Sequence, residues 1–161
     1  MSYAEARRGP LSLFNDIIYA NVTGSGGVSR SVSGGEATAT FGANVKADYT
    51  LAIIEAGGAY AIWSRGRQGS AGATAFDVLA GARYWHQEVD VSADLTGTLD
   101  RNGLTISGNR AIASSGSVDW VDPFIGARLR HQLAPGEEIV VRGDVGGFGV
   151  GSQFTWQAIA T

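Results

Sequence analysis

The chain has 161 residues, including 24 glycines, 3 prolines and no cysteine, and its formal net charge is −3. The lack of cysteine excludes a disulfide framework and a cysteine-ligated metal site, and the small, dispersed charge excludes the basic patch of a nucleic-acid-binding protein. A glycine-rich, proline-poor chain of this length is typical of one strand-rich domain, here covering residues 1–161, rather than of a disordered linker.

An alternation of apolar and polar residues starts at the N-terminus and recurs along the chain. Successive side chains of a β-strand point to opposite faces, so an alternation with period two predicts a strand with one apolar face. In chain order, the pattern covers residues 3–7, 11–23, 47–63, 75–88, 121–130 and 140–158. We therefore predict six core strands.

The last of these segments carries the clearest pattern. Arg142 and Asp144 share one face, and Val141 lies on the opposite, apolar face. The phase of the alternation then slips at Gly146-Gly147. A glycine pair at such a slip is typical of a β-bulge, which we predict here within one continuous strand.

The connections between the predicted strands alternate in length. Short ones lie at residues 8–10, 64–74 and 134–137, whereas long polar segments occupy residues 24–46 and 96–117. We interpret the long segments as polar loops in the form of hairpin extensions. Short turns at one rim and long polar loops at the other are typical of outer-membrane barrels. The predicted fold is all-β, an antiparallel up-and-down (meander) β-barrel.

The polar face of nearly every predicted strand carries charge. Eleven of the 12 basic residues are arginine, which is suited to enclosed, bidentate pairing with carboxylates. Alternating signs favour a structural network in a narrow lumen over a conducting pore. The predicted lumen charge network consists of Glu5, Arg7, Asp16, Glu55, Asp77, Arg83, Asp122, Arg128, Arg142 and Asp144.

The opposite face is apolar and carries no charge in the core strands. Such a face suits a lipid-facing band, where Arg or Lys costs ~2 to 4 kcal/mol at the bilayer midplane. Aromatic residues near strand ends are typical of interfacial girdles, although the same residues would also suit an ordinary core. These aromatics are Tyr19, Tyr60, Trp63, Tyr84 and Trp156.

Catalytic motifs are missing from the sequence. It contains no GxSxG, HExxH or P-loop pattern, so we predict no enzyme activity, no cofactor and no metal site. Only His86 and His131 offer an alternative, a lipid hydrolase at the barrel rim that resembles outer-membrane lipid deacylases. That alternative requires a histidine beside a serine and a carboxylate in a cleft.

Several segments, in this order and spacing, resemble a family of Gram-negative outer-membrane β-barrel proteins, mostly small porin-like or opacity-like barrels without an assigned activity. The segments are SYAEAR at 2–7, IIEAGGAY at 53–60, FDVLAGARYW at 76–85, GSVDWVDPFIGARLRHQL at 116–133 and RGDVGGFGVGSQFTWQ at 142–157. In that family, further strands precede the first segment and follow the last. The resemblance therefore implies an outer-membrane location and a chain truncated at both ends.

Taken together, the sequence predicts an outer-membrane β-barrel that serves as a structural envelope protein or a small pore. Its predicted partners are a lipid bilayer or detergent and, through open sheet edges, further copies of itself, because six strands are fewer than the ~8 of the smallest single-chain barrels. The competing hypothesis is a soluble β-barrel with its apolar faces inside, binding a small apolar ligand.

Overall fold

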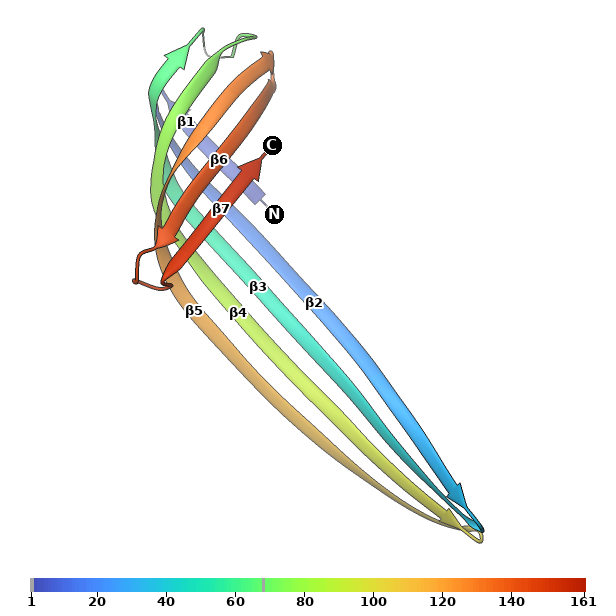
Figure 1. Cartoon of the computed structure of the whole chain (residues 1–161). Helices are drawn as coiled ribbons and strands as arrows, with labels where there is room; N and C mark the ends of the chain where they lie inside the picture. The colour runs from blue at the N-terminus through green and yellow to red at the C-terminus, as the bar shows by residue number, and fades with distance from the viewer. Residues whose placement is uncertain (1, 68) are drawn as a thin grey trace. The chain divides into compact units, whose positions relative to one another are not determined.

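The computed structural model describes residues 2–67 and 69–161, most of which lie in strands (Figure 1). The strands form a single sheet in which the order of the strands is that of the sequence, and neighbours are antiparallel. This confirms the predicted all-β, antiparallel up-and-down arrangement. The strands are β1 Ser2–Arg8, β2 Leu11–Gly34, β3 Ala37–Arg65, β4 Thr74–Arg101, β5 Leu104–Ala134, β6 Glu137–Gly147 and β7 Phe154–Ala160.

Two-residue turns join most of these strands, and glycine provides the left-handed backbone that such turns require. The turn between β4 and β5 contains Asn102 at φ 48° and Gly103 at φ 82°. Positive φ at both positions is the pattern of a type I′ hairpin, whose twist matches that of the flanking strands. The turn between β2 and β3 begins at Gly35, with φ 62°.

The predicted bulge at Gly146-Gly147 is wrong, because the chain reverses there. β6 ends at Gly147, whose φ is 92°, and Phe148 follows with φ 50°. After residues 148–153 the chain returns as β7, in which Phe154 pairs with Gly147. The core therefore has seven strands instead of six. A reversal that preserves the period-two pattern on both sides produces the same phase slip in the sequence as a bulge.

The predicted long loops are also corrected, since residues 24–46 and 96–117 lie mostly in strands. They form the distal parts of two hairpins, β2–β3 and β4–β5, which turn at residues 35–36 and 102–103. Side-chain hydrogen bonds such as Asn21 to Thr50 and Ser33 to Thr38 follow one unbroken register along the first hairpin. Hydrogen-bonded polar side chains thus pair across two regular strands, so these segments are hairpin extensions, as interpreted, but not loops.

The chain divides into two compact units. Unit 1 comprises the described residues of Met1–Tyr19, Ala52–His86 and Asp119–Thr161, and unit 2 comprises Ala20–Leu51 and Gln87–Val118. Unit 1 contains β1, β6, β7 and one part of each of the four long strands. Unit 2 contains the distal parts of the two hairpins.

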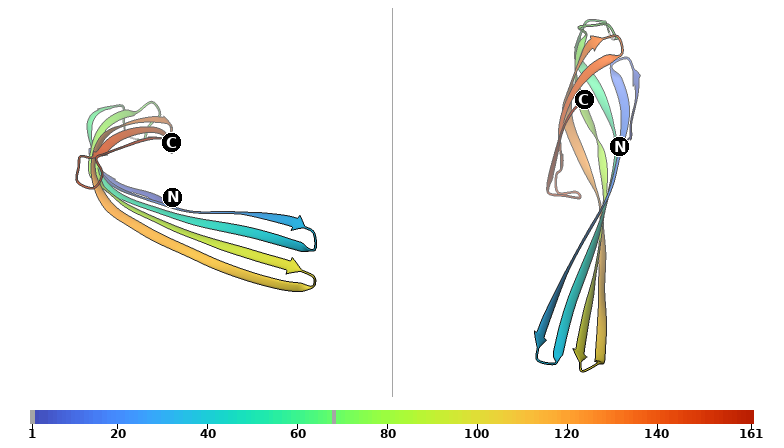
Figure 2. Two further views of the ribbon diagram at one scale, coloured as in Figure 1. Left: turned by 60° about the horizontal axis from the view of Figure 1, so that its bottom comes forward. Right: turned by 90° about the vertical axis from the view of Figure 1, so that its right-hand side faces the viewer.

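The sheet of unit 1 is strongly curved. Glu5 lies on β1 and Arg128 on β5, which would be about 19 Å apart in a flat sheet with a strand spacing of ~4.8 Å. Their side chains nevertheless meet, with 2.9 Å between Glu5 Oε2 and Arg128 Nη1. Figure 2 shows the strands of this unit bending round, with both chain ends on the open side. β1 and β7 are the two edges of the sheet, so the sheet is not closed into a barrel.

Unit 1 buries charge and exposes apolar side chains. Among the described residues, the buried hydrophobic core consists of Phe14, Ala59, Leu79 and Phe124, whereas ten polar or charged residues are buried. On the other face, Leu13 is 61% exposed, Ile125 56% and Trp156 70%. This is the inverse of the distribution in a water-soluble protein, where ionised side chains are almost never fully buried unless paired.

Unit 2 is a single layer with no buried residue, and the structure describes all of its residues. Along β3 the residues Phe41, Val45 and Leu51 share one parity, and Lys46 and Asp48 share the other. Asp48 contacts the Lys46 ammonium at 2.8 Å, and this hydrogen bond, together with one from the Thr23 hydroxyl, lowers the pKa of Asp48. Unit 2 is therefore an amphipathic sheet. No helix in the described residues has the length and hydropathy to cross a membrane.

Candidate functional site

The concave face of unit 1 carries the predicted lumen residues. Eight of the ten are buried, and the other two, Glu5 and Arg7, are half-buried. The strand register explains their common face: Glu5 lies opposite Phe14 across β1 and β2, and Arg128 lies opposite Arg142 across β5 and β6. We call this surface the inner face.

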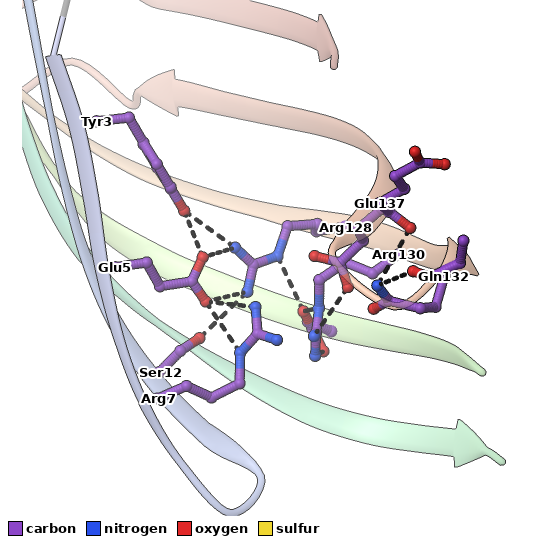
Figure 3. Close-up of polar contacts among 11 residues, drawn as sticks. Tyr3, Glu5, Arg7, Ser12, Arg128, Arg130, Gln132 and Glu137 are labelled. Carbon is purple, nitrogen blue, oxygen red and sulfur yellow. Dashed lines mark hydrogen bonds and ion pairs between the residues drawn. The ribbon is translucent and has the colours of Figure 1, made fainter. Parts of the chain in front are cut away.

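One ion-pair cluster joins β1, β4 and β5 (Figure 3). Arg128 binds two carboxylates, since its Nε donates to Asp77 Oδ2 at 2.9 Å and its Nη1 donates to Glu5 Oε2 at 2.9 Å. Arg130 binds Asp77 with both Nε and Nη2, at 2.7 and 3.0 Å. Glu5 is also bound by Arg7, whose Nη2 donates to Oε1 at 2.9 Å. Shared carboxylates of this kind lock several strands together, because each charge loses its water and depends on its partners.

A second cluster joins β3, β4 and β6. Arg83 donates to Glu55 Oε2 from Nε at 2.8 Å and to Asp144 Oδ1 from Nη2 at 2.8 Å. Arg142 Nη2 lies 2.6 Å from Glu55 Oε1 and 2.9 Å from Asp144 Oδ2. Two guanidiniums therefore alternate with two carboxylates in a closed ring. Arg83 also donates to Gln157 on β7.

Aromatic rings of the small apolar core lie directly against these guanidiniums. The Arg142 guanidinium carbon is 4.8 Å from the centroid of the Phe14 ring and 5.3 Å from that of Phe124. The Arg83 guanidinium lies 5.1 Å from the same Phe124 ring. At these distances the ring quadrupole attracts the cation. Phe124 therefore packs in the core and also stabilises two arginines.

Two predicted lumen residues lie outside both clusters. Asp122 binds the reversal between β6 and β7: its Oδ1 accepts from the Ser152 N–H at 2.7 Å and its Oδ2 accepts from the Trp120 indole N–H at 3.0 Å. Asp16 is buried, and no hydrogen bond or ion pair reaches its carboxylate from the residues that the structure describes. Asp122 thus fixes a turn, and Asp16 is the only predicted lumen residue without a partner.

Sequence reasoning missed some members of the network. Arg130 shares the parity of Arg128 on β5, so the alternation alone could have identified it. Tyr3 also shares the parity of Glu5, and its hydroxyl donates to Glu5 Oε2 at 2.6 Å. Gln157 alternates with Trp156, so the alternation alone gives its polar face, but its contact with Arg83 depends on the reversal of the chain after Gly147.

The two histidines contact residues other than serine. His86 Nδ1 lies 2.7 Å from Asp119 Oδ1, and the same oxygen accepts a hydrogen bond from the Tyr84 hydroxyl. His131 Nδ1 lies 2.9 Å from the Thr74 hydroxyl. None of these contacts assembles the serine, histidine and carboxylate that the hydrolase alternative requires. Among the described residues, no group of three or more His, Cys, Asp or Glu is placed to hold a metal ion.

The ion pairs of the inner face can therefore hold the strands together, and its charged groups can bind a charged ligand. The inner face presents fixed guanidiniums and carboxylates beside a cavity of about 340 Å³. A scan against protein-family models and a search of curated protein sequences each gave no match to this chain.

Proposed function

We propose that unit 1 is the membrane-spanning part of an outer-membrane β-barrel, with lipid on its apolar face and the charge network inside. The observation that carries this proposal is the inverted burial: Asp77 is 1% exposed and Asp122 0%, whereas Trp156 is 70% exposed. In water, this distribution costs free energy on both faces. In a bilayer, lipid solvates the apolar face and the ion pairs lie away from it.

The height of the apolar face supports the same proposal. On β4 the outward-facing aromatics Phe76 and Tyr84 are separated by eight residues, or about 26 Å along the strand. With the ~40° tilt of barrel strands, this becomes about 20 Å along the membrane normal, so both rings lie near the edges of an apolar band ~25 Å tall. Tyr84 is the last apolar residue of this parity, which continues with His86 and becomes charged at Glu88.

The apolar residues of β4 are even-numbered in unit 1 and odd-numbered in unit 2. This change of parity also supports the proposal that the strand passes from lipid into water. On β4 the odd-numbered residues are charged and buried in unit 1, as in Asp77 and Arg83. In unit 2 the odd-numbered residues of β4 are apolar, as in Val89 and Val91, and the even ones include Asp90. A change from apolar to polar along one parity is expected where a strand leaves lipid and enters water.

The interior favours a structural role over transport. The two ion-pair clusters and the rings of Phe14 and Phe124 occupy the inner face, and each of the five guanidiniums in the clusters is held by a carboxylate. A small pore is the second candidate, supported by the cavity of about 340 Å³ on the open side. In either case, the backbone groups at the edges β1 and β7 need partners in lipid. We propose that self-association through these edges supplies them.

Tryptophan fluorescence in bilayers tests the membrane proposal. Trp156 lies on the apolar face, whereas Trp85 lies on the inner-face parity and stacks on Trp120 with 5.6 Å between ring centroids. Variants that retain only Trp156 or only Trp85 are reconstituted in vesicles containing brominated lipids. Strong quenching of Trp156 and weak quenching of Trp85 is the expected result. A protein that stays monodisperse without detergent and shows no quenching of Trp156 would contradict the membrane proposal.

A further inference from the structure

Asp16 is a buried carboxylate in an unusual situation. It is 5% exposed, and no hydrogen bond or ion pair reaches it from the described residues. Tyr3 lies directly opposite on β1, but the Tyr3 hydroxyl donates to Glu5. Burial of a carboxylate without a partner costs desolvation free energy. A cation that binds beside it therefore gains more interaction free energy than a cation beside a solvated carboxylate.

The Asp16 side chain faces a cavity that is large enough for a small molecule. The cavity has a volume of about 340 Å³ and lies between the two edges of unit 1, with Tyr3 on β1 and Ile159 on β7 in its wall. Val140 contributes a further apolar surface. Ligand pockets typically combine such apolar walls with a few polar groups that fix the orientation of the ligand.

The charges around the cavity leave Asp16 as the single unmatched group. Three arginines and three carboxylates line the cavity: Arg128, Arg130 and Arg142 with Glu5, Asp16 and Glu138. All of them except Asp16 are in ion pairs, and each of the three arginines is held by at least one carboxylate. Asp16 is therefore the one charged group of the lining that is left to pair with a ligand, and its negative charge favours a cation over an anion.

We propose that this cavity binds a small organic ammonium ion, with the charged nitrogen at Asp16 and an apolar chain against Val140 and Ile159. A primary ammonium donates hydrogen bonds to a carboxylate, and the ring of Tyr3 in the cavity wall can attract the same charge. A divalent metal ion is a poorer ligand, because it needs several oxygen ligands and Asp16 is a single carboxylate. The site does not depend on whether lipid covers the outer face.

A titration with n-butylammonium tests this site. Binding to the folded protein, in detergent or in buffer, is followed by NMR of the methyl groups of Val140 and Ile159. We expect a Kd on the order of 1 mM for so small a ligand. Asp16→Asn keeps the shape but removes the charge, and it should weaken binding at least about tenfold. Glu36→Gln, at an exposed turn residue of unit 2, should leave binding unchanged.

Two further measurements decide the outcome. n-Butanol has the same chain without the charge and should bind at least about tenfold more weakly than n-butylammonium. Val140→Phe fills the cavity while retaining Asp16, and it should also abolish binding, which keeps the test valid if Asp16→Asn does not fold. Equal binding of n-butanol and n-butylammonium, or unchanged binding to a folded Asp16→Asn variant, would overturn the proposal.

Discussion

Unit 1 and unit 2 are built from the same four long strands, yet they distribute polarity in opposite ways. Unit 1 buries Asp77 and Arg83 and exposes Ile125, whereas unit 2 buries nothing and carries Asp48 and Lys46 on an open face. The strands themselves differ little in alternation or length. What differs is the strength of the interactions, because an ion pair away from water depends on its partners and an exposed one is screened.

Removal of a carboxylate is expected to give the largest difference between the units in the loss of unfolding free energy. Asp77→Ala leaves Arg128 and Arg130 without their shared carboxylate, so we expect unit 1 to lose about 3 to 5 kcal/mol of unfolding free energy. Asp48→Ala in unit 2 removes an exposed, solvent-screened pair and should cost far less than Asp77→Ala. Urea unfolding of both variants in the same vesicles or detergent measures the two losses. Equal losses would mean that the inner face is solvated like unit 2.

Apolar residues on the outer face of the sheet provide a second test of the difference between unit 1 and unit 2. Ile125→Arg places a charge on the outer face of β5, and if lipid covers that face we expect a loss of about 2 to 4 kcal/mol. Ile106→Arg makes the same change on the same strand within unit 2, where the side chain is 61% exposed, and should cost less than about 1 kcal/mol. Unfolding in vesicles compares the two variants. A harmless Ile125→Arg would contradict the presence of lipid on the outer face.

Two glycines with positive φ allow the cost of backbone strain to be separated from the cost of a steric contact. Gly147 has φ 92°, and a Cβ there would lie 2.5 Å from Ser152 Oγ, whereas Gly35 has φ 62° with open space around it. Gly147→Val in unit 1 should therefore cost about 2 to 3 kcal/mol, and Gly35→Val in unit 2 about 1 to 2 kcal/mol. Thermal unfolding followed by circular dichroism gives the order. If Gly35→Val costs as much as Gly147→Val, the contact with Ser152 contributes nothing.

The core strands and the shared face of the charges followed from period two alone, because alternation records which side chains share a face of the sheet. Glu5 and Arg128 could be assigned to one face in this way, but their contact could not, since it depends on the curl of the sheet across four strand spacings. The reversal after Gly147 was missed because a reversal and a bulge produce the same phase slip in the alternation. Residues 24–46 were predicted only as a polar hairpin extension and not as regular strands, because serine, threonine and glycine resemble a loop in composition and differ only in register.

Removing unit 2 should have a smaller effect than any change to the network. The hydrogen bonds Asn21 to Thr50 and Thr23 to Asp48 continue the register of the first hairpin, which brings Tyr19 opposite Ala52. Replacing residues 20–51, and separately 87–118, by Asn-Gly turns therefore preserves the pairing within unit 1. We expect unfolding free energies within about 1 kcal/mol of the intact chain, measured by urea unfolding. A loss similar to that of Asp77→Ala would show that unit 1 needs unit 2 to fold.

The smallest expected effect is the titration of Asp48, which isolates an exposed ion pair. The hydrogen bond from the Lys46 ammonium, followed by that from the Thr23 hydroxyl, lowers the pKa of Asp48 in the folded hairpin. A carboxyl whose pKa is lowered by folding stabilises the fold fully above its unfolded pKa, and this contribution is lost as the pH falls through the lowered, folded pKa. Carbon-13 NMR of the carboxyl group measures this pKa directly, and Lys46→Met should raise it towards the ordinary value. An unchanged pKa in that variant would assign the shift to Thr23, and Thr23→Val would then produce the rise. Because the pair is exposed, added salt should shrink the effect of Lys46→Met, whereas the loss in Asp77→Ala should persist at the same salt concentration.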